Sequence, residues 1–366
     1  MRLADYSHGM LQISASIRHF TGLKSEYEED RELSEWLNRG SYRSVAVILI
    51  DGMGKNIMDM HLEKNSFFMS HKLKDTDTVY PPTTAAATTA FLTGKSPKET
   101  GWLGWNQYFK EKDDQIILFR DMSQYKEGAV YPGFVKKALP IKMIYDELNE
   151  REECADSVWP SFSIHNPCSS YPELLNKVKD CLEKPNNRFV YAYWDMLDDH
   201  MHRNGTAVSS TKELLREIEK QTQSALKSFP EDTAVIFIAD HGHIDVRHYE
   251  LSDNEKLMEC LDKAPALEGR TIAFYLKKGK EKIFDEEFKR VLGNDFVLWT
   301  HQQVKESDLF GLHEAHPRFE EFIGDRLALA VNDIQIDYCH KGSQLKGNHA
   351  GATEAELRIP VIVWHK

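Results

Sequence analysis

Short, continuous apolar runs alternate along the chain with longer stretches in which apolar residues recur at helical spacing. The apolar runs span 44–50, 189–194, 233–239 and 359–363, and each is bounded by polar or turn-forming residues. Runs of this length predict strands that are buried on both faces, as in a parallel sheet. Helical spacing recurs in six segments: 10–33, 53–64, 84–93, 171–184, 206–228 and 281–292. This alternation predicts an α/β fold with a doubly wound, mostly parallel sheet and helices on both faces.

The pattern changes between about residues 245 and 345. Three strand-like pieces, 271–276, 296–300 and 327–331, lie there among charged helical segments, and the last strand of the main sheet comes only afterwards. We therefore predict a smaller α+β subdomain, 245–345, inserted into a catalytic core made of residues 1–244 and 346–366.

Charge and composition exclude several classes of protein. The 366 residues carry a formal net charge of −12, which argues against binding to nucleic-acid polymers and anionic lipids. The longest apolar runs have six residues, whereas a membrane-spanning helix needs about 20, and the N-terminal segment lacks an apolar signal core. Five scattered cysteines without a C-x-x-C pair are typical of reduced thiols, so we expect a cytoplasmic protein. The sequence carries no signal for an oligomeric state.

Acidic residues and histidines follow or precede the predicted strands. The set is Asp51, Asp198, His202, Asp240, His241 and His349. Asp198 and His202 are four residues apart, which places them on one face of a helical turn. His200 and Asp195 form a competing pair, but their spacing of five is unfavourable on a helix. Because ligands of parallel sheets collect at the carboxyl ends of the strands, we expect the six residues to converge on one site.

Three carboxylates and three imidazoles suit two divalent cations with three protein ligands each. Open coordination positions would then remain for a nucleophile and for substrate oxygens. The absence of cysteine from the set is typical of catalytic rather than structural metal sites. The donor types favour Zn²⁺, and they are also compatible with Mn²⁺ or Fe.

Five motifs together resemble one known family. They are LIDGMG (49–54), PPTTAAATTAFLTGKSPKETGW (81–102), LDDHMHRNG (197–205), ADHGH (239–243) and GNHAG (347–351). In this order they resemble the alkaline phosphatase superfamily, and within it the type I phosphodiesterase/nucleotide pyrophosphatase family, over residues 44–363. The resemblance implies a two-metal hydrolase that cleaves phosphodiester or pyrophosphate bonds in small, nucleotide-type substrates.

The resemblance also implies roles for individual residues. Thr84 corresponds to the nucleophile that forms a phospho-threonine intermediate, and Thr83 is then only a neighbour. One metal ion would be held by Asp51, Asp240 and His241, and the other by Asp198, His202 and His349. Asn106, one position later than the family pattern, would contact a phosphoryl oxygen.

Other functions are compatible with the same residues. A phosphomonoesterase, or a phosphonate hydrolase of the phosphonoacetate type, would use the same metal ligands and nucleophile. A non-catalytic metal-binding or scaffold protein would retain the fold without the activity. A diester substrate needs an apolar pocket for its second ester group, and Trp102, Trp105, Tyr108 and Phe109 are candidates for its walls, although they are equally typical of core residues.

Overall fold

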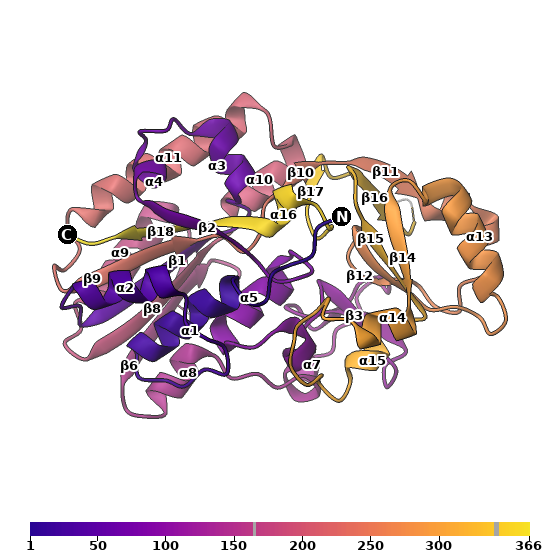
Figure 1. Cartoon of the computed structure of the whole chain (residues 1–366), viewed down its shortest axis with the longest axis horizontal. Helices are drawn as coiled ribbons and strands as arrows, with labels where there is room; N and C mark the ends of the chain where they lie inside the picture. Colours follow the sequence, from indigo (N-terminus) through magenta and orange to yellow (C-terminus); the bar gives the residue numbers. More distant parts are fainter. Residues whose placement is uncertain (164–165, 340–343) are drawn as a thin grey trace.

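The chain forms two seven-stranded sheets that lie side by side, as the computed structural model shows (Figure 1). The structure describes residues 1–163, 166–339 and 344–366. Helices cover both faces of the main sheet, which contains all four strands predicted from the long apolar runs. The expected α/β fold with helices on both faces of a sheet is therefore confirmed.

The main sheet is parallel at its centre and antiparallel at one edge. Its strands, in spatial order, are β2 (Lys72–Asp77), β18 (Arg358–Trp364), β9 (Thr233–Ile238), β1 (Ser44–Ile50), β8 (Asn187–Trp194), β6 (Cys154–Pro160) and β7 (Pro167–Cys168). Strand β1 pairs in parallel with both β8 and β9, while β18 runs antiparallel to β9 and β2. All seven residues of β1 are buried because helices cover both faces of the sheet at this position.

The helices of the main sheet form two groups, one on each face (Figure 1). One group contains α1 (Met10–Phe20), α2 (Arg31–Arg39), α5 (Thr84–Thr93) and α8 (Ile144–Asn149). The other contains α3 (Lys55–His61), α4 (Phe67–Ser70), α9 (Tyr171–Leu182), α10 (Met196–Asn204) and α11 (Ser209–Leu226). Helix α5 is buried at every position after Thr84, and its alanines allow close packing beneath the sheet edge.

The second sheet is built from two separate parts of the chain. Its strands, in spatial order, are β14 (Phe296–Thr300), β15 (Arg326–Ala330), β13 (Thr271–Phe274), β12 (Ala266–Leu267), β3 (Asn106–Phe109), β4 (Asp114–Ile117) and β5 (Met122–Ser123). The predicted segment 245–345 supplies the first four strands, and β3 to β5 come from residues 106–123. The two parts join where Leu267 pairs with Asn106. The second sheet therefore extends beyond the predicted insertion.

Helices also cover the second sheet. Helix α13 (Glu281–Leu292) packs Phe284, Phe288 and Leu292 against one face. The short helices α7 (Phe134–Ala138), α14 (His301–Glu306) and α15 (Phe319–Phe322) contribute to the core on the other face. The remaining short elements are α6 (Pro97–Thr100), β10 (Ile244–Asp245), β11 (Arg247–Glu250), η1 (Leu251–Asp253), α12 (Glu255–Met258), β16 (Ile334–Asp337), β17 (Gly347–Asn348) and α16 (Glu354–Leu357).

Some predicted boundaries match the structure and one predicted helix is wrong. The bounds of β1, α5 and α13 are those expected from the sequence. The single helix expected over 10–33 is instead two helices, α1 and α2. Helix α1 ends before Gly22, which has a φ of +78°, a conformation that side-chain-bearing residues rarely adopt.

A buried ion pair links the two sheets near the C-terminus. Arg270, which precedes β13, donates from Nε to Glu356 Oε1 of α16 at 2.7 Å, and both side chains are fully buried. Glu356 Oε1 also accepts a hydrogen bond from the backbone N–H of Gly351 at 2.7 Å. Thr271 of β13 donates to the carbonyl oxygen of Ala350, which has a φ of +81°. Residues of the second sheet thus hold the turn that follows His349.

Removal of one partner of this ion pair is expected to destabilise the protein strongly. In Arg270→Leu, the Glu356 carboxylate stays buried without its cation, so we expect the free energy of unfolding to fall by about 3 kcal/mol or more. Urea titration followed by tryptophan fluorescence measures the change. The matched control is Arg247→Leu, because Arg247 pairs with Asp333 on the surface, where an ion pair contributes little to stability. Equal stability losses in the two variants would contradict the prediction.

Within the described residues, no helix is both long enough and apolar enough to cross a membrane. All five cysteines are free thiols, and three of them are buried. The cytoplasmic location expected from the sequence stays a prediction.

Candidate metal centre and active site

The centre of the main sheet brings the predicted metal ligands to one edge. Strands β9, β1 and β8 are neighbours and run parallel, so their carboxyl ends lie together. Asp51 follows β1, Asp240 lies just beyond β9, and Asp198 lies in the first turn of α10, directly after β8. His202 lies one turn further along α10, as its spacing from Asp198 predicts.

Asp51, Asp240 and His241 form the first ligand group. One side-chain ligand atom from each lies within 4.8 Å of the others, and all three residues are buried. Gly52 turns the chain sharply after Asp51 with a φ of +71°, and its N–H donates to Asp240 Oδ1 at 3.1 Å. This turn therefore ties the ends of two neighbouring strands together.

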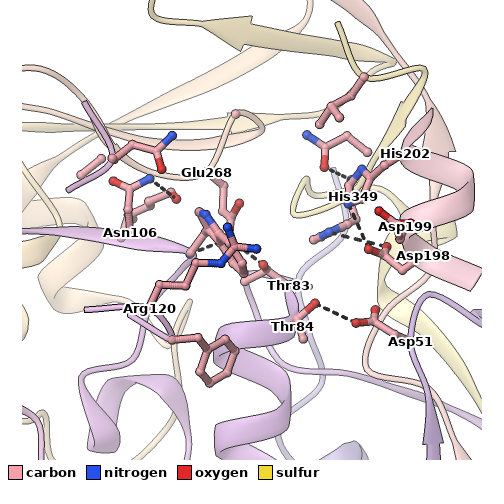
Figure 2. A pocket seen from close by; sticks show the side chains of 18 of the residues that line it. Asp51, Thr83, Thr84, Asn106, Arg120, Asp198, Asp199, His202, Glu268 and His349 are labelled. Atoms are coloured by element: carbon pink, nitrogen blue, oxygen red, sulfur yellow. Dashed lines mark hydrogen bonds and ion pairs between the residues drawn. The ribbon is translucent and has the colours of Figure 1, made fainter. Parts of the chain in front are cut away.

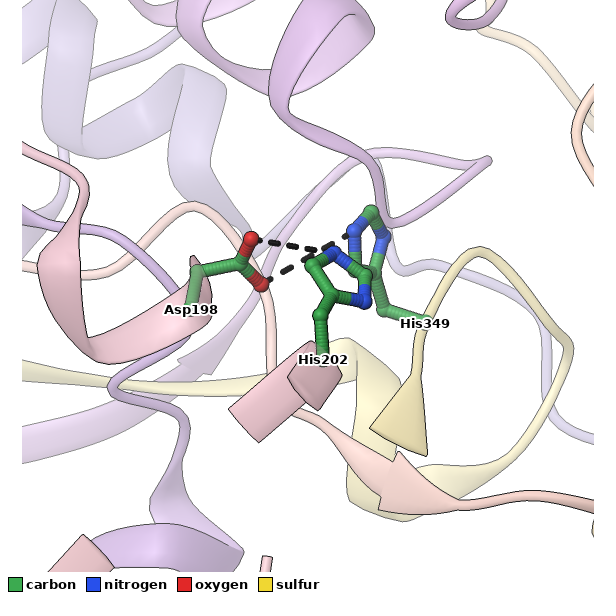
Figure 3. A group of neighbouring side chains, drawn as sticks. All are labelled: Asp198, His202 and His349. Carbon is green, nitrogen blue, oxygen red and sulfur yellow. Dashed lines mark ion pairs between the residues drawn. The ribbon is translucent and has the colours of Figure 1, made fainter. Parts of the chain in front are cut away.

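Asp198, His202 and His349 form the second ligand group (Figure 3). Their ligand atoms also lie within 4.8 Å of one another. Asp198 Oδ2 is 3.0 Å from His202 Nε2, and Asp198 Oδ1 is 3.9 Å from His349 Nε2. Burial raises the pKa of Asp198, but the neighbouring His202 and His243 outweigh burial and hold that pKa well below its ordinary value. The structure thus brings together both trios expected from the sequence.

The three predicted histidines share one orientation. In each, Nδ1 donates a hydrogen bond to a backbone carbonyl, so the Nε2 atom faces the carboxylates. The acceptors are the carbonyl oxygens of Gly347 for His202 (2.9 Å), Gly242 for His241 (3.0 Å) and Pro82 for His349 (3.0 Å). Metal-binding histidines are commonly fixed in this way, because the hydrogen bond sets both the tautomer and the direction of the free nitrogen.

The carboxylates of both groups are buried. Within the described part of the chain, Asp51 Oδ1 and Asp240 Oδ2 accept no hydrogen bond, and the contact of Asp198 Oδ1 is with the imidazole Nε2 of His243, at 3.2 Å. Burial raises the pKa of Asp51 well above its ordinary value, and the charges of Asp240 and Asp198 raise it further. The rings of His241 and His349 stack with centroids 3.7 Å apart, so the two groups adjoin. Buried carboxylates this close together require compensating positive charge, and the donor set fits two divalent cations.

Thr84 lies beside the first ligand group (Figure 2). It is the first residue of α5, and its hydroxyl oxygen is 3.3 Å from Asp51 Oδ2 and 3.2 Å from His241 Nε2. Asp51 Oδ2 also accepts a hydrogen bond from the hydroxyl of Tyr193. The Thr84 side chain is therefore directed at the first group from the N-terminal end of a buried helix.

The neighbouring threonine points elsewhere. Thr83 is the N-cap residue of α5, but its hydroxyl makes no cap and donates instead to Glu268 Oε1 at 2.6 Å. The same oxygen accepts from the backbone N–H of Trp105 at 2.7 Å. Burial raises the pKa of Glu268 to about 7. Through these two hydrogen bonds, Glu268 connects the loop before α5 with the segment before β3, at the wall of the site.

Asn106 begins β3 and also faces the site. Its Nδ2 donates to the carbonyl oxygen of Leu267 at 3.1 Å, which leaves the second N–H of the amide available. Leu267 has a φ of +80°, an uncommon backbone conformation for a residue with a branched side chain. The amide of Asn106 is therefore held at the junction of β3 and β12.

A cavity of about 1270 Å³ opens over both ligand groups. Thr84, Asn106 and residues of both groups line one part of it. Its other walls carry aromatic side chains: Trp105, Phe119, Tyr125, Tyr145, Trp159, Phe162, Tyr193 and Tyr338. Of the four aromatic residues considered from the sequence, Trp105 lines the cavity, whereas Trp102 and Phe109 are buried in the core of the second sheet and Tyr108 donates to Asp113. The aromatic wall therefore comes mainly from other segments.

Comparison of the sequence with family models shows the family of the chain. The model of the type I phosphodiesterase/nucleotide pyrophosphatase family matches residues 45–349, well over half of the chain. The chain belongs to this family. Membership of a phosphodiesterase and nucleotide pyrophosphatase family supports a phosphoester hydrolase. No curated protein matches the sequence significantly.

Solved structures of two kinds of hydrolase share the fold of this protein. Murine ectonucleotide pyrophosphatase/phosphodiesterase 5, an inactive form solved in complex with AMP, has 16% sequence identity and a TM-score of 0.66, with 87% of each chain covered. Phosphonoacetate hydrolase from Sinorhizobium meliloti 1021, solved with phosphonoacetate, has 13% identity and a TM-score of 0.63, with 88% of this chain and 90% of that chain covered. At these low sequence identities, the similarities show a shared fold.

Several residues of this site were not predicted from the sequence. His243, two residues after His241, is fully buried with Nε2 at 3.2 Å from Asp198 Oδ1, and burial lowers its pKa to about 4. Its position in the ADHGH motif was the available signal. Glu268 and Tyr193 lie in unremarkable local sequence, and only the fold brings them to the site. His200, in contrast, contacts Ser210 and belongs to neither ligand group.

Proposed function

We propose that the protein is a two-metal hydrolase that cleaves phosphodiester or pyrophosphate bonds of nucleotide-type substrates through a phospho-threonine intermediate on Thr84. The observation that carries the proposal is the contact of the Thr84 hydroxyl with Asp51 and His241, beside the second ligand group. Family membership supports the same reaction class.

The proposed reaction proceeds in two steps. The Thr84 oxygen attacks the phosphorus atom, the bond between phosphorus and the leaving oxygen breaks, and the hydroxyl proton passes through solvent to the leaving oxygen. Water then attacks the phosphorus of phospho-Thr84, the bond between phosphorus and the threonine oxygen breaks, and a proton of this water passes to the threonine oxygen. When bound, the two divalent cations would favour the deprotonated threonine and stabilise the charge on the attacking and leaving oxygens.

The residues around Thr84 would position the phosphoryl group. Thr84 begins α5, and the free backbone N–H groups at a helix N-terminus bind phosphoryl oxygens favourably. Asn106 would donate its remaining amide N–H to another phosphoryl oxygen. Tyr193, which donates to Asp51, would hold this carboxylate in place.

The six nitrogen and oxygen ligands support Zn²⁺ as the cation, with Mn²⁺ or Fe as further candidates. The substrate would be a small phosphorylated molecule, because the acidic chain does not favour nucleic-acid polymers.

The charge around the site favours a diester over a monoester. Asp199 and Asp337 also line the cavity outside both ligand groups, so a phosphoryl group bound there would have further acidic side chains nearby. A diester carries one negative charge on its phosphoryl group and a monoester carries nearly two at neutral pH, so the monoester would be repelled more strongly. The aromatic walls would accommodate the second ester group.

A comparison of three substrates tests the proposal. The protein is assayed with Zn²⁺ or Mn²⁺ on the p-nitrophenyl ester of TMP, on p-nitrophenyl phosphate and on phosphonoacetate. We expect kcat/KM for the diester to exceed that for the other two at least tenfold. A preference for p-nitrophenyl phosphate would establish a monoesterase, and a preference for phosphonoacetate would establish a phosphonate hydrolase; either result would overturn the diester assignment.

A further inference from the structure

Arg120 lies on the cavity wall opposite the ligand groups (Figure 2). It follows β4, and its side chain points into the cavity. Its guanidinium carbon lies 5.3 Å from the centroid of the Trp105 ring, a distance typical of a cation–π contact. The aromatic face therefore supports the guanidinium group at the edge of the cavity.

Arg120 carries a positive charge in a cavity lining that contains several acidic residues. Among the described residues that line the cavity, Arg120 is the one arginine or lysine. The same lining carries acidic residues outside both ligand groups: Asp195, Asp199, Glu250, Glu268 and Asp337. Over the described ranges, the Arg120 guanidinium forms no ion pair and no hydrogen bond. Guanidinium groups bind phosphate and carboxylate strongly through paired N–H donors, and those of Arg120 are available.

Trp105 connects Arg120 to the surroundings of the nucleophile. The backbone N–H of Trp105 donates to Glu268, which also accepts from Thr83, the residue before Thr84. Trp105 also directly precedes Asn106 in the chain. The backbone of Trp105 is therefore tied through Glu268 to the residue that precedes Thr84.

We propose that Arg120 binds a second anionic group of the substrate, a phosphate or a carboxylate, beyond the phosphoryl group attacked by Thr84. The inference rests on the proposed function and specifies its substrate class as molecules with a second negative charge, such as nucleoside polyphosphates. The acidic side chains elsewhere on the wall would repel that charge, so Arg120 determines where the group lies. Arg120 is a specificity-determining residue and takes no part in bond cleavage.

Substrates with and without a second anion test this role. We expect Arg120→Gln to lower the ratio of kcat/KM for ATP to kcat/KM for bis(p-nitrophenyl) phosphate by about tenfold to a hundredfold, chiefly through KM for ATP, because the variant lacks the positive charge and the paired N–H donors of the guanidinium group. Arg120→Lys should restore part of the ratio. The matched control is Lys112→Gln, which removes a positive charge from the turn between β3 and β4, at the other end of β4 from Arg120 and outside the cavity lining. A ratio that changes less than twofold in Arg120→Gln would overturn the proposal.

Binding measurements separate this inference from the proposed reaction. Calorimetry measures the affinities of ATP and phosphonoacetate for Thr84→Ala protein with and without Arg120→Gln. Weaker binding of ATP alone identifies a phosphate site, and weaker binding of phosphonoacetate alone identifies a carboxylate site. Unchanged affinity for both ligands rejects the role of Arg120. If the unmodified protein hydrolyses neither ATP nor the diester, the proposed function fails, and these affinities still decide whether Arg120 binds anions.

Discussion

Replacement of Thr84 by alanine is expected to lower kcat for the p-nitrophenyl ester of TMP by a factor on the order of 10⁴ or more, because removal of a catalytic nucleophile leaves only binding and charge stabilisation. Metal content should stay near that of the unmodified protein, since the six proposed metal ligands are intact in the variant. Steady-state kinetics and elemental analysis of the same preparation measure both quantities.

The neighbouring threonine provides the control for Thr84. Thr83→Ala removes a hydroxyl that donates to Glu268, so it should lower kcat far less than Thr84→Ala. If both variants lose activity equally, the hydroxyl of Thr84 has no special role. If Thr84→Ala retains full activity, the nucleophile lies elsewhere.

Replacement of Asp198 by asparagine is expected to remove one metal ion and lower kcat/KM by a factor on the order of 10⁴. Asp198 is the carboxylate of the second ligand group and lies 3.0 Å from His202 and 3.2 Å from His243. A neutral amide is a weaker ligand, and charge stabilisation by a metal ion contributes several kcal/mol to a phosphoryl transfer. Elemental analysis should find the metal content reduced by one ion per chain.

Asp199 is the matched control for Asp198. It is the next residue on α10, and it forms an ion pair with Arg203 instead of entering a ligand group. Asp199→Asn should therefore keep the metal content of the unmodified protein. Loss of metal from both variants, or from neither, would contradict the assignment of Asp198 as a ligand.

The main sheet could be predicted because its central strands are buried on both faces. Continuous apolar runs marked β1, β8 and β9, and the helical segments between them predicted parallel pairing, whereas the fourth run, β18, pairs antiparallel with its neighbours. The edge strand β2, KLKDTD, was missed because it is charged and partly exposed. In the same way, β3 and β4 are short and rich in polar residues, so their sequence does not distinguish them from a loop.

The candidate site could be predicted where its residues adjoin the ends of those strands. Asp and His at strand ends are visible as motifs, and the fold then brings them together. Glu268 and Arg120 could not be found in this way. Glu268 reaches Thr83 across 185 positions of the chain, and Arg120 enters the cavity through the unpredicted hairpin of the second sheet. Such residues depend on long-range topology, which a local pattern does not encode.

The Arg270–Glu356 ion pair has a consequence for how this protein could diversify. The turn that carries His349 is held on one side by Glu356 and on the other by Thr271 of the second sheet. The second sheet also supplies Glu268 and Arg120 to the cavity wall. A homologue in which another domain replaced this sheet would lose both the support of the turn that carries His349, a proposed metal ligand, and the proposed substrate contact of Arg120. Substrate range in this architecture is therefore expected to change by substitutions on the existing sheet rather than by replacement of the whole module.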